Sequence, residues 1–167
     1  MRMHRLETLQ IFPRGVDEVF AFFADARNLE RITPEFLRFR IVTPQPISMG
    51  VGTEITYALS LHGFPMRWVS RIDAWEPGRR FVDRQLSGPY ARWVHEHTFE
   101  PVPGGTRVAD RVDYALPLDP LSRPLHDRFV RPDVERIFAH RHRVLAEHFG
   151  TPLRTARRAP AVALSPR

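Results

Sequence analysis

The sequence predicts an α+β fold, in which a curved antiparallel sheet of about seven strands, two short helices and a long C-terminal helix enclose a cavity. Runs of alternating polarity, separated by turns of a few residues, follow one another from residue 36 to residue 116, as in an antiparallel meander. One strand and two short helical segments precede this meander. A long amphipathic segment follows it, and such a helix can cover the apolar face of a curved sheet.

The first 34 residues are expected to form one strand and two helices. Residues 3–12 alternate loosely in polarity, and a Pro-Arg-Gly turn follows them. The apolar residues of 16–23 then recur at the i, i+3, i+4, i+7 spacing of an amphipathic helix. Asp25 can cap a second helix over residues 26–32, which Pro34 ends.

Six more strands and a long helix complete the predicted domain. The strands are expected at residues 36–43, 53–61, 64–75, 79–87, 91–101 and 106–116. Pro132 suits the first turn of the last helix, which is expected to end near Phe149. Gly150 suits the position just after that helix. The folded domain is therefore expected to span residues 1–150.

Residues 151–167 differ in composition from the rest of the chain. They hold four arginines and no acidic residue, and they are rich in alanine and proline, so we expect a disordered tail. The net charge of the whole chain is +6, of which these four arginines supply four charges, which leaves +2 for the domain. Because the domain shows no basic stripe interleaved with aromatic residues, we expect no specific nucleic-acid partner.

The composition also excludes several kinds of chemistry. The sequence contains no cysteine and no lysine, which rules out disulfides, thiol catalysis and Schiff-base catalysis. No apolar run is long enough to span a bilayer, and the first ten residues lack the apolar region of a signal peptide. We therefore expect a cytoplasmic protein without stable membrane insertion.

The stretch from residue 88 to residue 99, GPYARWVHEHTF, carries the clearest candidate site. Strand alternation places Trp93, His95, His97 and Phe99 on one face, whereas the opposite face is better suited to water. Imidazoles on an inward face need partners or a ligand. This strand is therefore expected to line the cavity.

The hairpins beside this strand predict which residues share its inward face. The expected cross-strand pairs are His97 with Asp110, His95 with Val112 and Trp93 with Tyr114, and Asp83 and Gln85 are expected near His95 and Trp93. Tyr57 and Trp68 join this wall from earlier strands. The wall is thus expected to be aromatic and aliphatic around a polar patch of Asp83, Gln85, His95, His97 and Asp110.

Arg141 lies on the apolar stripe of the last helix, three residues after Phe138 and four before Leu145. An arginine on such a stripe must find a carboxylate or reach solvent. Two interpretations therefore stay open. Arg141 pairs with Asp83 or Asp110 across the cavity, or its side chain extends from the helix edge into water.

The order of elements, together with five segments of the sequence, resembles a known superfamily. The segments are VDEVFAFFADARNLERITP (16–34), LHGFPMRW (61–68), FVDRQLSGPYARWVHEHTFEP (81–101), GGTRVADRVDYALP (104–117) and RIFAHRHRVL (136–145). Over residues 3–150 the chain resembles the helix-grip (SRPBCC) superfamily of START domains, birch-pollen-allergen-like proteins, polyketide cyclases and coenzyme Q-binding proteins. Within it, the chain is most similar to a bacterial subgroup associated with cyclase/dehydrases or with cell division inhibitors. The resemblance implies a cavity between sheet and long helix that takes an apolar or aromatic molecule.

Three interpretations of the His95-x-His97 pattern remain open. The imidazoles and the acids opposite them can satisfy one another and hold the sheet or a ligand in place. A histidine held by Asp83 or Asp110 can instead transfer protons in a cyclisation or dehydration, as polyketide cyclases of this superfamily do. A metal site of two histidines and one carboxylate is the third and least favoured, because further ligands are not distinctive.

The favoured hypothesis is the binding of an apolar or aromatic small molecule, such as a lipid, a quinone or a polyketide-like compound, under the last helix. The alternatives are a cyclase or dehydratase and an adaptor that acts through its surface and basic tail. We expect no metal and no cofactor. The expected ligand-binding residues are Tyr57, Trp68, Gln85, Trp93, His95, His97, Val112, Tyr114, Phe138 and Arg141, and the catalytic candidates are His95, His97, Asp83 and Asp110.

Overall fold

The computed structural model describes residues 1–118, 124 and 126–150, and the backbone of residues 163–166. Its strands are β1 (His4–Phe12), β2 (Arg40–Ile41), β3 (Glu54–Leu61), β4 (Phe64–Glu76), β5 (Arg80–Ser87), β6 (Arg92–Val102), β7 (Gly105–Ala115) and β8 (Ala163–Pro166). Its helices are α1 (Val16–Ala24), α2 (Arg27–Arg31), the 3-10 turn η1 (Glu35–Leu37), the π-helical turn η2 (His126–Val130) and α4 (Arg131–Phe149).

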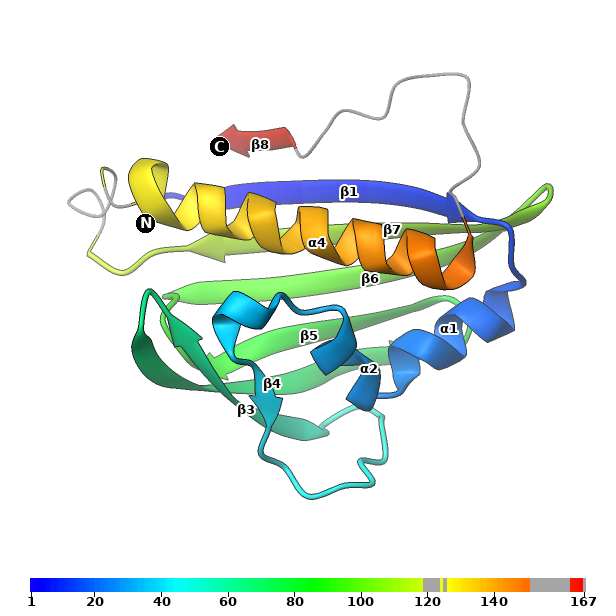
Figure 1. Ribbon diagram of the computed structural model, residues 1–167, viewed down its shortest axis with the longest axis horizontal. Coiled ribbons are helices and arrows are strands. Elements are labelled where there is room, and N and C mark those ends of the chain that lie inside the picture. The colour runs from blue at the N-terminus through cyan, green and yellow to red at the C-terminus, as the bar shows by residue number, and fades with distance from the viewer. Residues whose placement is uncertain (119–123, 125, 151–162, 167) are drawn as a thin grey trace.

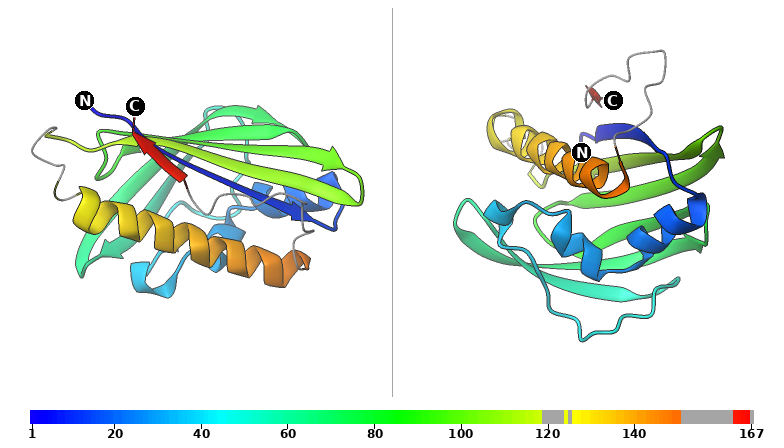
Figure 2. Two further views of the ribbon diagram at one scale, coloured as in Figure 1. Left: turned by 90° about the horizontal axis from the view of Figure 1, so that it is seen from above. Right: turned by 45° about the vertical axis from the view of Figure 1, so that its right-hand side comes forward.

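In the described residues the strands form one antiparallel sheet in the order β2-β3-β4-β5-β6-β7-β1-β8. The chain leaves β1 through α1 and α2, reaches the far edge at β2 and returns as a meander to β7, which pairs with β1. The sheet curves over α4, and α1 and α2 lie on the same side as α4 (Figures 1 and 2). The predicted α+β class is confirmed.

The predicted register of the central hairpins is confirmed as well. His97 pairs with Asp110, His95 with Val112, and Trp93 with Tyr114 between β6 and β7. Asp83 pairs with His95 between β5 and β6. These pairs follow from the short turns that join the strands, because a hairpin turn fixes which residues lie opposite each other.

The strand predicted at residues 36–43 is wrong for most of its length. Pro34 precedes a single 3-10 turn, η1, and Arg38 then adopts a left-handed conformation at φ 44°, which breaks the extended backbone. Only Arg40–Ile41 pair with β3. The alternation of apolar residues in this segment nevertheless has a packing cause, because Leu37 and Phe39 both line the cavity.

The tail also differs in part from the expected disorder, because residues 163–166 form β8 and pair with β1. The rest of the predicted tail, residues 151–162 and 167, lies outside the described residues. Within the part of the chain that the structure describes, no helix is long and apolar enough to cross a membrane.

Buried apolar residues form three clusters around the cavity. The first joins α1 to the C-terminal half of α4 through residues such as Phe20, Phe99 and Phe149. The second joins β1 and β7 to the N-terminal half of α4, and the third lies between α2 and β3. Residues of all three clusters border the hollow between the sheet and α4.

Candidate functional site

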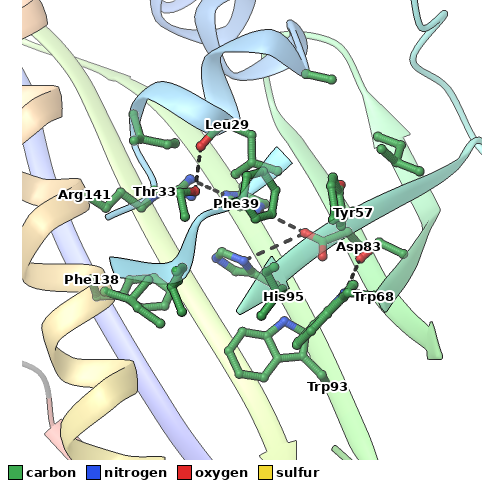
Figure 3. A pocket seen from close by; sticks show the side chains of 18 of the residues that line it. Leu29, Thr33, Phe39, Tyr57, Trp68, Asp83, Trp93, His95, Phe138 and Arg141 are labelled. Carbon is green, nitrogen blue, oxygen red and sulfur yellow. Dashed lines mark hydrogen bonds and ion pairs between the residues drawn. The ribbon is translucent and has the colours of Figure 1, made fainter. Parts of the chain in front are cut away.

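A cavity of about 230 Å³ lies between the concave face of the sheet and the helices. Its wall is mostly aliphatic and aromatic: β3 and β4 contribute Tyr57 and Trp68, β6 contributes Trp93, and α4 contributes Phe138 (Figure 3). Strand alternation explains the wall, since every second residue of each strand points to this face. Such a surface, with few convergent polar groups, is typical of a small-molecule site.

The aromatic part of the wall is held in place by contacts among its own side chains. The rings of Trp68 and Trp93 pack edge to face with centroids 5.4 Å apart, and Tyr90 lies 4.7 Å from Trp93. The indole Nε1 of Trp68 donates a hydrogen bond to Ser70 Oγ at 2.9 Å. Because this indole N–H is already bonded, Trp68 presents mainly apolar ring surface to the cavity.

The polar part of the wall is a cluster of two imidazoles and two carboxylates, which we call the His–Asp cluster: Asp83, His95, His97 and Asp110. His95 Nε2 lies 2.9 Å and His97 Nδ1 lies 2.8 Å from the same oxygen, Asp110 Oδ1. The opposite nitrogens face Asp83 Oδ2, His97 Nε2 at 3.3 Å and His95 Nδ1 at 3.8 Å. Figure 3 shows the Asp83 carboxylate pointing toward His95 beside the two tryptophans.

Asp110 lies behind the two imidazoles rather than on the cavity surface. It is only 4% exposed, it accepts a hydrogen bond from Thr8 Oγ1 at 3.3 Å, and Arg141 Nη2 lies 3.6 Å from its Oδ1. Burial alone would raise its pKa, but Arg141 and the hydrogen bonds from His95 and His97 hold the pKa well below its usual range. Asp110 is therefore a carboxylate, and a carboxylate can only accept hydrogen bonds.

The charge state of His95 follows from its surroundings. Burial lowers the pKa of His95, and the neighbouring His97 lowers it further against the opposing effect of the two acids. The imidazole of His95 is thus neutral near pH 7. Since its Nε2 donates to Asp110, its Nδ1 carries a lone pair on the side of Asp83.

Arg141 takes the paired arrangement rather than the solvent-exposed one. Its side chain is buried beside Asp110, and its guanidinium carbon lies 5.2 Å from the centre of the Phe23 ring. Its Nε has no hydrogen-bond partner among the described residues. The helix therefore places a cation at the cavity wall and directs it to the carboxylate that holds both imidazoles.

Eight of the predicted site residues line the cavity: Tyr57, Trp68, Asp83, Trp93, His95, His97, Phe138 and Arg141. Four others do not, and one of them is Asp110, which lies behind the two imidazoles. Gln85 bonds the backbone of Tyr90 and closes the turn between β5 and β6, whereas Val112 and Tyr114 are fully buried in the core between β7 and α4. The sheet curves, so the inward face of β7 packs under α4 and only the strands beyond it face the hollow.

Sequence reasoning missed the part of the cavity wall that α1 and α2 form. The helical pattern of residues 16–23 favours a core position for Phe23, yet this ring lines the hollow together with Leu29 and Thr33 of the α2 region. Tyr90 was also missed because it lies in the turn before β6. The apolar face of the 16–23 helix was a usable signal, but the sequence alone did not say whether this face met the sheet or a cavity.

The chain has the helix-grip fold that the resemblance implied. Solved structures with this fold include TTHA0849 from Thermus thermophilus, at 22% identity and a TM-score of 0.63 over 86% of this chain and 98% of that one. CV1439 from Chromobacterium violaceum aligns at 14% identity and a TM-score of 0.66, over 87% and 96% of the two chains. The di-domain ARO/CYC StfQ from the steffimycin biosynthetic pathway aligns at 15% identity and a TM-score of 0.64, over 89% of this chain and 50% of that one. At these identities the likeness concerns the fold.

A family model assigns the chain to a narrower group than the fold does. The family described as Domain of unknown function (DUF8410) matches residues 59–149, more than half of the chain, and the chain belongs to this family. No curated protein is detectably similar to the chain. The matched segment runs from β3 to the end of α4, and it contains the whole His–Asp cluster and Arg141.

Proposed function

We propose that this protein binds a small apolar or aromatic molecule in the cavity between the sheet and α4. The observation that carries the proposal is the wall itself, in which mostly aliphatic and aromatic side chains surround the His–Asp cluster. The likeness to an ARO/CYC and to other proteins of this fold supports a ligand-binding scaffold. The volume of about 230 Å³ lies below the lower limit of about 300 Å³ for drug-sized sites, and favours a compound of one or two rings over a long-chain lipid.

Calorimetric titration with 1-naphthol, 1,4-naphthoquinone and decanoate tests this proposal. We expect the two-ring compounds to bind the full chain and decanoate to bind more weakly. Ile137→Trp, on the cavity side of α4, fills part of the hollow and should lower affinity at least about tenfold, or 1.4 kcal/mol. Ala139→Trp, at an exposed position of the same helix, is the matched control and should bind like the unmodified chain. Absence of binding by all three compounds, or equal binding by both variants, would contradict the proposal.

The His–Asp cluster favours a second candidate, an enzyme that moves a proton at carbon next to a carbonyl. In this mechanism His97 Nε2, at the cavity wall, acts as the general base and Asp110 orients the ring through Nδ1. The α-protons of 2-tetralone, a two-ring ketone, would then exchange with deuterated solvent faster in the presence of the protein. We expect His97→Ala to remove about 10²–10⁴-fold of such an acceleration. If 2-tetralone binds without accelerated exchange, the protein is a binding protein for this class of compound.

A further inference from the structure

The donor atoms of Asp83, His95 and His97 converge on one point of the cavity wall. One atom from each residue lies within 4.8 Å of the other two. Both histidines are buried, whereas the Asp83 side chain is 21% exposed and faces the hollow. Asp83 and His95 are paired positions of β5 and β6, and His97 lies two residues further along β6, so the sheet fixes their spacing.

Each imidazole turns one nitrogen toward Asp110 and the other toward Asp83. His95 Nε2 donates a hydrogen bond to Asp110 Oδ1 at 2.9 Å, so its Nδ1 directs a lone pair toward the Asp83 carboxylate. His97 Nδ1 lies 2.8 Å from Asp110 Oδ1 and 3.4 Å from Arg141 Nη2, and His97 Nε2 lies 3.3 Å from Asp83 Oδ2.

The charges of the cluster also favour a bound cation. Asp83 and Asp110 bring two negative charges, and the nearby Arg141 is directed to Asp110. Among the described residues, the ion-pair partners of Asp83 are the two imidazoles, and no arginine pairs with it. A buried or half-buried carboxylate in that position needs a cation or a proton.

We propose that Asp83, His95 and His97 bind one divalent transition-metal ion of the Zn²⁺ class. Two imidazoles and one carboxylate form a donor set of catalytic zinc sites, which keep a fourth position open. Bonds of 2.0–2.2 Å at tetrahedral angles separate donor atoms by about 3.3 Å. The 3.3 Å from His97 Nε2 to Asp83 Oδ2 matches this value, and the 3.8 Å from His95 Nδ1 needs a shift of about half an ångström.

Asp110 supplies the carboxylate that such sites need to hold their metal-binding histidines in place. Metal-bound histidines usually donate their other N–H to a carboxylate, which fixes the tautomer and the ring orientation. Here one buried carboxylate does this for both rings, and Thr8 and Arg141 hold it in turn. The open position faces the cavity, where a ligand with a carbonyl or phenolic oxygen would complete the coordination. The metal site does not depend on the small-molecule proposal, and it departs from our sequence-based expectation of no metal.

The test uses the full chain without a polyhistidine tag, stripped with a chelator and then titrated with Zn²⁺ by calorimetry and with Co²⁺ by visible absorption. We expect about one ion per chain and the spectrum of four-coordinate Co²⁺. His97→Ala and Asp83→Asn should lose stoichiometric binding. Asp110→Asn should lower affinity about 10–100-fold, since it acts on the metal only through the two rings. His140→Ala removes an imidazole from α4 outside the cluster and should bind like the unmodified chain.

Asp83→Asn keeps the proposal testable if His97→Ala fails to fold. It has the same shape as Asp83, and its amide can donate a hydrogen bond to His95 Nδ1, so the metal-free variant should fold like the unmodified chain. Failure of the unmodified chain to bind either ion would overturn the proposal and leave the cluster as a set of imidazole–carboxylate pairs. Binding retained by both Asp83→Asn and His97→Ala would overturn it as well.

Discussion

At the scale of single residues, Asp110 holds the polar part of the cavity together. Side chains from three elements converge on it: Thr8 of β1, Arg141 of α4 and the two histidines of β6. A buried charge with several partners contributes little net stability as a group, but the removal of one partner leaves the others unpaired. The cost of losing Asp110 is therefore the cost of a buried arginine without its carboxylate.

We predict that Asp110→Asn lowers the free energy of unfolding by about 3 kcal/mol in the presence of a chelator. Glu100→Gln is the control, because Glu100 pairs with Arg107 across the same two strands but on the exposed side. That change should cost less than about 1 kcal/mol. Urea unfolding of both variants measures the difference. Equal losses in the two variants would show that the buried network has no special role.

His142 is a second single residue with a predictable effect, because it makes the stability of the fold fall at acidic pH. Burial lowers the pKa of this histidine, and Arg141 lowers it further while Asp110 opposes the shift. Because the unfolded chain, with a pKa of about 6.5, takes up the proton more readily, stability is lost as the pH falls below that value. We predict that His142→Gln makes this loss shallower, without removing it, since His95 shifts in the same direction. Urea unfolding between about pH 7.5 and pH 5 measures the slope, and an unchanged slope would contradict this assignment.

At the scale of secondary-structure elements, the pairing of the central strands could be predicted from the sequence. Alternation and short turns gave the register of β5, β6 and β7, and with it the contacts of Asp83, His95, His97 and Asp110. Curvature was not predictable from alternation, because it depends on how the whole sheet wraps around α4. This is why Tyr114 was expected at the cavity and lies in the core, where its hydroxyl bonds His126.

Two elements are linked where the β3–β4 turn meets the start of α4. His62 Nε2 lies 2.7 Å from Asp133 Oδ2, and Asp133 lines the cavity. His62 is half exposed, so the link adds little stability, but it joins the turn to the helix beside the hollow. If a ligand enters the cavity at this point, such contacts have to open.

We predict that His62→Ala speeds both association and dissociation of 1-naphthol and changes its affinity by less than about threefold, or 0.7 kcal/mol. The reason is that the free and the bound protein both make this link, and only the opening transition breaks it. Its removal therefore lowers the barrier and leaves the free-energy difference between the two states unchanged. Stopped-flow fluorescence gives both rates. Glu135→Ala, which removes the Arg131–Glu135 pair on the outside of the same helix, should leave them unchanged. Equal rates for His62→Ala and the unmodified chain would show that entry occurs elsewhere.

At the scale of the whole molecule, the fold packs its two ends and leaves its middle hollow. One end is filled by the aromatic cluster around Phe20, Phe99 and Phe149, and the other by the cluster around Leu6, Tyr114 and Val134. Between them the helices and the sheet stand apart around the cavity. Unfilled apolar space lowers stability, because the surrounding atoms lack contacts on one side. The hollow is therefore a cost to folding, which a molecule bound there would offset.

Ala26 offers the sharpest test of this cost, because it is a small buried residue at the start of α2 that lines the cavity. Ala26→Leu adds three carbon atoms toward the hollow. At about 0.8 kcal/mol for each buried methylene, reduced by imperfect fit, it should stabilise the ligand-free protein by about 1–2 kcal/mol. That gain corresponds to a rise in Tm of roughly 2–8 °C for a chain of this size. The same variant should bind 1-naphthol more weakly, because the added side chain takes the space that the ring needs. A variant that is less stable and binds as well as the unmodified chain would mean that Ala26 faces packed core instead of usable space.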